Sequence, residues 1–325
     1  MPPRHRPIAD TRKPPIKRAV RRYTPRRRHT RRRGRSFFLS MLLILAFALI
    51  YHFAGDRILN RLGNTPVTVI LAENEVMVSF IDVGQGDSIL VRSSNNAVLI
   101  DGGEHSQRNA VRTYLRNAGV RRLDYVVATH PHSDHIGGLV SILGWFDVGY
   151  VVMPDITHNT NTFERFLDAI ENNDIDVIFP TPGQSITAGI INFTVIAPPN
   201  PHPGPRGNPN NASIVLRLEH GQNSFLFTGD AEQELEQWMV NSGINLSSCV
   251  LQVPHHGSQT SSSEIFLDAV NPSDAVISLG LNNSHGHPHQ SVINRLNARN
   301  IRIHRTDQLG TIRMITNGRY IRLLR

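Results

Sequence analysis

The sequence predicts an α/β fold in which strands and helices pack in layers. Hydrophobic residues make up 39% of the 325 residues and charged residues 18%, which allows a sizeable core and excludes a wholly disordered chain. From Val67 onward, short runs rich in β-branched residues alternate with amphipathic helical stretches. No internal repeat at a fixed period is visible. We therefore expect one layered domain over residues 67–325.

Charge separates the N-terminal residues from the rest of the chain. Residues 1–35 contain 15 of the 34 Lys and Arg residues and one acid, Asp10. The remaining 290 residues contain 19 basic and 25 acidic residues, so the net charge of +8 reflects the tail and does not indicate a nucleic-acid-binding body. Because this segment is rich in proline, repels itself and lacks an apolar period, we expect residues 1–36 to form a disordered basic tail.

An apolar run follows the tail, over residues 37–54. Its 18 residues include three polar interruptions and lie near the lower limit of the about 17–25 residues that cross a hydrocarbon core. We expect this run to be a transmembrane anchor, joined to the domain by a linker over residues 55–66. A cleaved signal peptide is the alternative, because Ala46-Phe47-Ala48 resembles a cleavage site.

The basic residues decide the expected orientation of the anchor. Fifteen of them precede it, whereas only Arg57 and Arg61 follow closely. The positive-inside rule therefore predicts a single-pass protein of the cell membrane with a cytoplasmic N-terminus and an extracytoplasmic domain. The arginine clusters could instead hold the phosphates of DNA or RNA. Their position directly beside the apolar run favours a leader that sets topology and contacts lipid.

Glycine and asparagine turns divide the first part of the domain into strands. Gly84-Gln85-Gly86 and Ser94-Asn95-Asn96 each separate two β-rich runs. The two glycines form either a tight turn or a phosphate-binding nest, and the neighbouring Asp82 and Asp87 either cap that turn or face the functional site. The strands expected in this part are Val76–Asp82, Ser88–Arg92, Ala97–Asp101, Tyr125–Thr129 and Tyr150–Met153, and the helices are Asn109–Asn117, Ile136–Phe146 and Thr162–Asn172.

A proline-rich stretch interrupts the domain after its middle. Pro198–Asn211 contains six prolines, so we expect it to be a loop. The strands expected on either side of it are Val177–Phe179, Asn192–Ala197, Ile214–Glu219, Ser224–Thr228, Val250–Val253, Ala275–Leu279, Ile301–Arg305, Gly310–Ile315 and Tyr320–Leu324, and the helices are Glu232–Asn241, Glu264–Val270 and Gln290–Ala298.

Metal-ligand residues are concentrated in a run of six residues between a predicted strand and a predicted helix. Three histidines and Asp134 supply imidazole and carboxylate ligands, the set that first-row divalent metals prefer. A strand-to-helix turn can direct alternate side chains to two points, so His130 and His132 would take one ion, and Asp134 and His135 a second. The single cysteine, Cys249, excludes an intramolecular disulfide framework and a multi-cysteine zinc site.

This run resembles the His-x-His-x-Asp-His motif of the metallo-β-lactamase fold, an αβ/βα sandwich of metal-dependent hydrolases. Further motifs narrow the resemblance to the hydrolase-like domain of the ComEC/Rec2 competence protein group, which takes up transforming DNA and whose domain is regarded as a nuclease. The resemblance covers residues 76–316, and the group's multi-spanning channel region has no counterpart beside this chain's single apolar run. The motifs are Asp82–Ser88, Leu99–Gly103, Phe227–Asp230, Val253–Ser258 and Ser284–His289.

The resemblance implies the roles of further residues. Asp230 would bridge two divalent ions, Zn or Mn, although the same carboxylate could cap the helix that follows it. Asp101 would orient His130 or His132, because a ligating imidazole usually needs a hydrogen-bond acceptor behind it. The implied metal ligands are His130, His132, Asp134, His135, Asp230 and His287, with His285 and His289 as substitutes for His287.

The sequence departs from the family pattern at the first ion. Many enzymes of this fold have a histidine before the bridging aspartate, and an amide oxygen is a poor zinc ligand but acceptable to Mn or Mg. We expect His255 or His256 to fill the gap, or one of the two to protonate a leaving group. The residues that stand at the histidine's place are Asn208, Asn210, Asn211 and Ser213.

Two metal ions that stabilise the attacking and the leaving oxygen suit ester hydrolysis. We expect a membrane-anchored hydrolase of phosphodiesters, a DNA nuclease related to DNA uptake, in which Asp134 orients the water and a separate channel protein is a partner. The alternatives are a small cell-envelope ester or lactone as substrate, and an inactive DNA-binding module. One arginine stripe would form either a DNA-contacting surface or a solvated helix face: Arg108, Arg112, Arg116, Arg121 and Arg122.

Overall fold

The computed structural model describes residues 69–202 and 208–324. The predicted tail, anchor and linker lie outside the described residues, so they stay predictions. Among the described residues, no helix combines the length and the apolar character that a membrane span needs. Pro66–Arg325 forms one compact unit.

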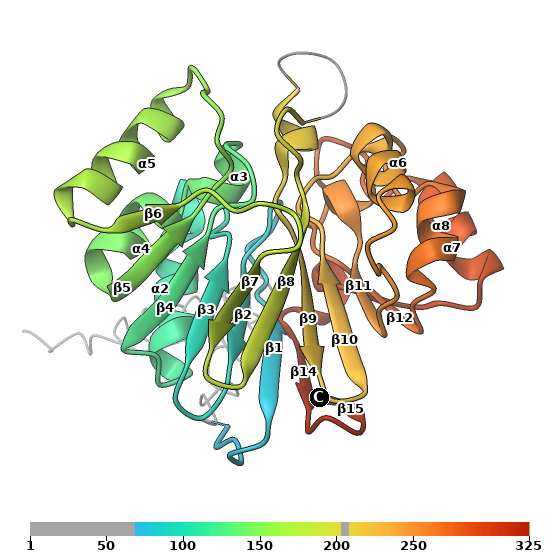
Figure 1. Cartoon of the computed structure of the whole chain (residues 1–325), viewed down its shortest axis with the longest axis horizontal. Helices are drawn as coiled ribbons and strands as arrows, with labels where there is room; N and C mark the ends of the chain where they lie inside the picture. Colours follow the sequence, from blue (N-terminus) through green and yellow to red (C-terminus); the bar gives the residue numbers. More distant parts are fainter. Residues whose placement is uncertain (1–68, 203–207, 325) are drawn as a thin grey trace, which may run out of the picture. The chain divides into compact units, whose positions relative to one another are not determined.

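Two β-sheets form the centre of this unit (Figure 1). In the first sheet, β1 to β3 are antiparallel and β3 to β6 are parallel. The strands of the first sheet, in order across it, are β15 (Ile321–Leu324), β14 (Ile312–Thr316), β1 (Val76–Phe80), β2 (Ile89–Arg92), β3 (Ala97–Ile100), β4 (Arg122–Val127), β5 (Asp147–Val152) and β6 (Asp176–Ile178).

The second sheet repeats this design, with β7 to β10 antiparallel and β10 to β13 parallel. Its strands, in order across it, are β13 (Arg302–Arg305), β12 (Asp274–Ile277), β11 (Val250–Gln252), β10 (Asn223–Phe227), β9 (Val215–His220), β8 (Ile191–Ala197) and β7 (Ser185–Ala188).

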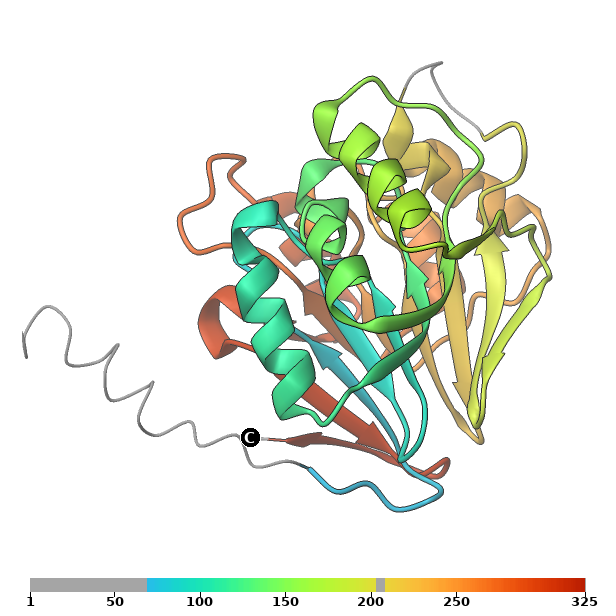
Figure 2. The same ribbon diagram turned by 90° about the vertical axis from the view of Figure 1, so that its left-hand side faces the viewer.

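Helices cover the outer face of each sheet, which gives four layers and confirms the predicted αβ/βα sandwich (Figures 1 and 2). Parallel strands need crossover helices, and these helices bury apolar side chains against their own sheet. On the first sheet lie α2 (Arg108–Asn117), α4 (Leu139–Trp145) and α5 (Asn161–Asn172), and on the second lie α6 (Gln233–Asn241), α7 (Glu264–Val270) and α8 (Gln290–Ala298). The short helices are η1 (His105–Gln107), α3 (Ser133–Ile136), η2 (Pro209–Ala212), η3 (Pro254–Gly257) and α9 (Thr306–Leu309).

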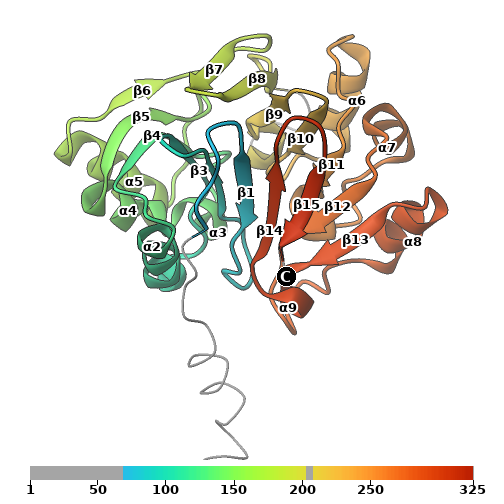
Figure 3. The ribbon, with the colours of Figure 1, turned by 90° about the horizontal axis from the view of Figure 1, so that it is seen from below.

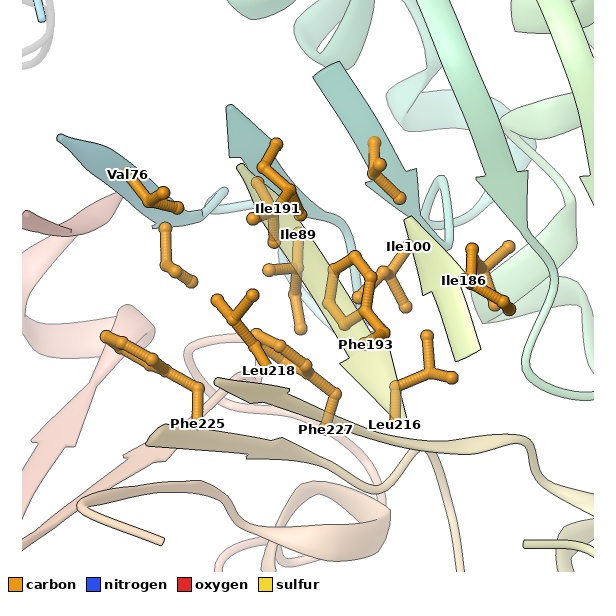
Figure 4. Close-up of a cluster of buried hydrophobic side chains, with 14 of the residues drawn as sticks. Val76, Ile89, Ile100, Ile186, Ile191, Phe193, Leu216, Leu218, Phe225 and Phe227 are labelled. Carbon is orange, nitrogen blue, oxygen red and sulfur yellow. The ribbon is translucent and has the colours of Figure 1, made fainter. Parts of the chain in front are cut away.

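The core between the sheets is built from alternate strand positions. Side chains at every second residue of a strand point to the same face, so one set from each sheet meets in the middle. Figure 4 shows this meeting, with Ile89 and Ile100 of the first sheet facing Phe193 and Phe227 of the second. The Phe227 ring lies 6.1 Å from the Phe193 ring and 6.3 Å from the Phe80 ring, measured between centroids.

The chain's last strands complete the first sheet. β14 pairs antiparallel with β1 over its whole length, from Val76 opposite Thr316 to Phe80 opposite Ile312. Figure 3 shows β14 lying beside β1, although more than two hundred residues separate them in sequence. β1 is therefore a central strand, held on both sides by antiparallel neighbours.

One predicted helix is divided in the structure, and one strand of the structure was not predicted. The helix predicted over Ile136–Phe146 is divided into α3 and α4: Gly137 and Gly138 keep helical φ and ψ angles, but the Gly138 N–H donates to the Gly103 carbonyl instead of continuing the helix. A Cβ atom at Gly138 would lie 1.9 Å from the carbonyl oxygen of Gly102, so this position must approach the neighbouring loop closely. Strand β7 was not predicted, because its four residues give too short an alternation to detect.

The parallel strands bring four loops to one edge of the sandwich. Loops that follow the carboxyl ends of parallel strands in α/β sheets commonly carry ligand sites. Here, the loops after β3, β4, β10 and β11 contain most of the aspartates and histidines selected from the sequence, whereas His287 follows β12 and Asp87 follows β1. The fold therefore gathers residues that are more than a hundred positions apart in the chain.

Candidate metal centre

The turn between β4 and α3 carries the His-x-His-x-Asp-His run. Asp101, at the end of β3, holds this turn in place because its carboxylate accepts hydrogen bonds from the backbone N–H (2.9 Å) and the hydroxyl (2.7 Å) of Thr129. His130 and His135 are buried, and His132 is partly buried. The run is thus a fixed, mostly buried turn.

Four imidazole nitrogens surround the carboxylate of Asp230, which is 2% exposed. Its Oδ1 lies 3.3 Å from Nε2 of His135 and 3.5 Å from Nε2 of His256. Its Oδ2 lies 3.6 Å from Nε2 of His130 and 3.8 Å from Nε2 of His255. Each carboxylate oxygen therefore faces two imidazoles, the arrangement expected around a carboxylate that bridges two metal ions.

Contacts at Nδ1, the ring nitrogen farther from Asp230, fix the orientation of the buried imidazoles of His130, His135 and His256. Each has an oxygen within hydrogen-bonding distance of its Nδ1, and an Nδ1–H that donates to that oxygen directs Nε2 toward Asp230. Metal-ligating histidines commonly carry such an acceptor. The acceptors are the Asp101 carboxylate for His135 (2.8 Å), the Ser278 carbonyl for His256 (2.9 Å) and the Thr129 hydroxyl for His130 (3.1 Å).

Several of the inward-facing atoms have no hydrogen-bond partner among the described residues. They include Nε2 of His135 and of His256, and Oδ1 of Asp87 and of Asp230. A buried polar atom without a partner costs about 1–3 kcal/mol, so these atoms indicate a missing group. Imidazole nitrogens and carboxylate oxygens in this mixture fit Zn or Mn.

The ligand atoms fall into two groups, each within 4.8 Å. One group contains His130, His132 and Asp230, and the other contains Asp87, His135, Asp230 and His256. Asp230 belongs to both groups. We call them the first and the second metal position.

The protonation of the metal-free centre follows from burial and charge. Burial raises the pKa of Asp87 to about 6, although the neighbouring His256 and His135 lower it. Burial lowers the pKa of His130 well below its usual value. Burial also opposes the charged form of His256, but the charge of Asp230 and the Asp134 carboxylate, 3.4 Å from Nε2, raise its pKa to about 9. Protonated His135 and His256 therefore offset the negative charge of the buried carboxylates beside them.

Comparison with known proteins places this geometry in a family. Residues 81–281 match the metallo-beta-lactamase superfamily. The chain belongs to this superfamily. ComE operon protein 3 of Bacillus subtilis is 35% identical over 257 residues, which cover 74% of this chain and 33% of that protein. Competence protein ComA of Neisseria gonorrhoeae is 35% identical over 244 residues, which cover 74% of this chain and 32% of that protein.

The chain thus spans 32–33% of the length of these relatives. Among solved structures, a variant of the CmlA β-hydroxylase has a TM-score of 0.50 at 13% identity, over 74% of this chain and 53% of that one. This likeness shows the fold alone. The superfamily and the relatives confirm the predicted resemblance to the ComEC/Rec2 group, and with the His/Asp groups they identify a metallo-β-lactamase-fold metal-dependent hydrolase related to competence proteins.

Two predicted site residues lie at the mouth of the centre. Asp134 has a side chain that is 26% exposed, and its Oδ2 lies 3.4 Å from Nε2 of His256 and 3.9 Å from Nε2 of His135. His287 belongs to neither ligand group, since its ring centroid lies 6.3 Å from that of His256 and 5.6 Å from that of His255. His256 occupies the place that the sequence analysis gave to His287. In the same turn, His285 stacks on the His287 ring, and His289 packs against that ring edge-on.

Two expectations about aspartates need correction. Asp101 does not orient His130 or His132 directly: it accepts from His135 and reaches His130 only through the Thr129 hydroxyl. Asp230 does not cap the following helix, because Glu232 occupies the N-cap of α6. The Asp230 carboxylate is available to the histidines.

Asp87 is a candidate ligand that the sequence analysis left open. Its side chain is buried, and one oxygen accepts a hydrogen bond from Nε2 of Gln252 (2.7 Å), while the other joins the second metal position. Its backbone N–H donates to the carbonyl oxygen of Asp134. Gly86 packs against the same carbonyl, so the glycine turn serves this contact rather than a phosphate nest. The sequence feature that could have identified Asp87 is its position directly after the Gly84-Gln85-Gly86 turn.

Three of the five arginines of the stripe contact neighbouring groups of the protein. Arg122 pairs with Asp147 at 2.6 Å, and the Arg112 guanidinium lies 4.4 Å above the ring of Trp145. Arg108 donates to the carbonyl of His105. These contacts favour a structured helix surface, and contact with DNA stays a proposal.

A cavity of about 460 Å³ lies at the opposite end of the second sheet, beside the starts of β11 and β12. It is lined by Asp274, Arg302 and His304, among others. These charges satisfy one another, because Asp274 binds Arg302 at 2.6 Å and His304 at 2.9 Å. Among the residues that the structure describes, only the centre around Asp230 combines buried, unpartnered ligand atoms with the superfamily motif.

Proposed function

We propose that the chain is a DNA nuclease, a phosphodiesterase that works with two divalent metal ions. The observation that carries this proposal is the Asp230 carboxylate, each of whose oxygens faces two imidazole nitrogens. Two ions held on such a carboxylate would supply Lewis acidity and a water of lowered pKa, which suits phosphodiester hydrolysis. The relation to competence proteins favours DNA over other phosphodiesters.

The residues of the chain divide into holding and orienting roles. His130 and His132 would hold an ion at the first position, and His135, His256 and Asp87 at the second, with Asp230 shared. His256 is 2% exposed, its Nδ1 lies 2.9 Å from the Ser278 carbonyl oxygen, and its Nε2 has no hydrogen-bond partner among the described residues. Its Nε2 is therefore placed to hold an ion rather than to protonate a leaving group.

Asp134 is placed to orient a water molecule. Its carboxylate lies at the edge of the second position, with a quarter of the side chain exposed. The pKa of Asp134 is lowered, since the nearby His135 and His256 imidazoles outweigh the effect of burial, so the carboxylate stays charged at neutral pH. A charged carboxylate at the mouth can accept a hydrogen bond from the attacking water.

We also propose that the domain lies outside the cytoplasm, held by an anchor over residues 37–54, and acts beside a separate DNA-uptake channel protein. The charge asymmetry around the apolar run supports this topology. A reporter fused after Arg325 should be active only outside the cytoplasm. Activity of the fusion in the cytoplasm would reverse the topology, and a soluble, shortened product would favour a cleaved signal peptide.

The activity is tested with the purified full-length chain, supplied with Mn²⁺ or Zn²⁺. Single-stranded DNA, double-stranded DNA, a generic phosphodiester and a lactone serve as substrates. We expect cleavage of DNA, and we expect a His132→Ala, Asp134→Ala double variant to lose it while it keeps its fold. Hydrolysis of the lactone alone would favour the small-ester alternative. Retention of DNA without hydrolysis at any metal concentration would favour the inactive DNA-binding module.

A further inference from the structure

The asparagine segment that stands where many enzymes of this fold have a histidine is turned toward helix α6. Nδ2 of Asn208 donates to Oε2 of Glu232 at 2.7 Å, and Nδ2 of Asn210 donates to Oε1 of the same residue at 3.1 Å. Nδ2 of Asn211 donates to Glu234 at 3.1 Å. The three amide nitrogens therefore brace carboxylates at the start of α6 and bring no imidazole to the centre.

The Glu232 carboxylate, held by these asparagines, in turn contacts the His255 imidazole. Its Oε1 lies 3.3 Å from Nδ1 of His255 and accepts a hydrogen bond from the hydroxyl of Thr260 at 3.2 Å. A carboxylate at this distance from Nδ1 favours the tautomer with hydrogen on Nδ1, so the lone pair is on Nε2. Among the histidines that surround Asp230, His130, His135 and His256 are held in the same way by other acceptors.

The Nε2 atom of His255 then faces the first metal position. It lies 3.8 Å from Oδ2 of Asp230, and Nε2 of His130 lies 3.6 Å from the same oxygen. The other oxygen has the matching pair, His135 and His256. His255 stands just outside the tight group of the first position with 21% of its side chain exposed, so it closes that position from the solvent side.

The backbone has an unusual conformation that makes this arrangement possible. His255 and His256 have φ angles of 51° and 54°, a left-handed conformation that costs about 1–2 kcal/mol for each non-glycine residue. It turns two consecutive side chains toward the two oxygens of one carboxylate. Such strain persists where the surroundings hold it, and it is concentrated at functional sites.

We propose that His255 is the third imidazole ligand of the first metal position and that Glu232 is its positioning residue. The histidine that many enzymes of this fold have before the bridging aspartate is thus replaced by one from the turn after β11, and the asparagines bind the Glu232 carboxylate that orients it. This inference rests on the proposed metal centre but does not depend on the substrate.

Metal binding tests the inference without reference to activity. The metal-free full-length chain is titrated with Mn²⁺ by calorimetry, together with His255→Ala, Glu232→Ala and Glu232→Gln. We expect two classes of ion in the wild type and a weakening of the first position by at least about 10–100-fold in His255→Ala and Glu232→Ala. Glu232→Gln should recover much of the affinity, because its amide oxygen still accepts the hydrogen bond from Nδ1.

Two further variants separate the positions. His132→Ala should weaken the same class of ion as His255→Ala, whereas His256→Ala should weaken the other class. Asn210→Ala tests the competing ligand, because Oδ1 of Asn210 has no hydrogen-bond partner among the described residues. We expect Asn210→Ala to have only a slight effect, since Asn208 still holds Glu232.

Several results would overturn the inference. His255→Ala with unchanged affinity for both ions and slower turnover would make His255 a proton donor. A large loss in Asn210→Ala, without one in His255→Ala, would make the amide oxygen the ligand. A wild type that binds no metal would remove the inference together with the centre. A wild type that shows the expected metal pattern but cleaves no DNA would instead support the inference and contradict only the proposed nuclease function.

Discussion

A single carboxylate, Asp230, organises the candidate site. It is buried, and four imidazoles approach it from two loops. In the absence of a cation, the surrounding charges lower its pKa well below the usual value despite burial, with His135 and His256 as the largest favourable contributions. The same residues must release protons before they can bind metal.

Proton release gives the first prediction. The pKa of His256 is about 9 and that of His135 is raised well above its usual value, so both carry an extra proton at pH 7 in the metal-free centre. Metal binding at pH 7 should therefore release protons, and the affinity should rise with pH until it levels off above about 9. Calorimetry in two buffers with different ionisation enthalpies measures the release. Binding without proton release at pH 7 would contradict these protonation states.

At the scale of elements, close contacts between loops shape the centre. The turn after β1 and the turn after β4 touch at Gly86, where an added Cβ atom would lie 2.2 Å from the carbonyl oxygen of Asp134. The loop after β3 and the break between α3 and α4 touch at Gly138 in the same way. Glycines at these points let three loops approach within contact distance.

A matched pair of glycines tests this role. Gly86→Ala should force apart the contact with the Asp134 carbonyl, displace the adjacent Asp87, whose backbone N–H donates to the same carbonyl, and so lower the affinity for the ion at the second position. Gly84→Ala is the control, because Gly84 also has a positive φ, of 69°, but an added Cβ there meets nothing within 4 Å. We expect Gly84→Ala to lose about 1–2 kcal/mol of stability at most and to keep both ions. Equal metal content in the two variants would show that the contact with Asp134 does not matter.

The sequence predicted those parts of the centre that are contiguous or fixed by a motif. The candidate ligands His130, His132 and His135 lie within six residues at the end of a strand, and Asp230 follows the strand β10. The choice between His256 and His287 could not be predicted, because it depends on the left-handed backbone of the turn after β11. Such a conformation at a non-glycine residue leaves no signal in the sequence.

At the scale of the molecule, the core between the two sheets fixes the distance between the loops that meet at the centre. Predictions of single strands and helices were mostly correct, because hydrophobic alternation specifies them locally. The pairing of β14 with β1 and the order of both sheets arise only when distant segments pack together. The fold class could therefore be predicted from the pattern, and the family resemblance supplied the sandwich.

The inter-sheet core should carry much of the stability. Phe227 is 1% exposed and contacts aromatic rings from both sheets, so Phe227→Ala should lower the free energy of unfolding by about 3–5 kcal/mol. Phe179→Ala is the control, because Phe179 is 53% exposed, and its effect should stay within about 0.5 kcal/mol. Urea denaturation measures both changes. Similar losses in the two variants would contradict the importance of this core.

The bridging role of Asp230 is the central claim, and electron paramagnetic resonance of the Mn²⁺-loaded chain tests it most directly. Two ions that share a carboxylate should lie about 3.5–4 Å apart and couple magnetically. We predict two Mn²⁺ per chain with a spin-coupled spectrum, and loss of the coupling in Asp230→Asn. One tightly bound ion at saturation, or two ions with the spectrum of isolated Mn²⁺, would contradict a carboxylate-bridged centre.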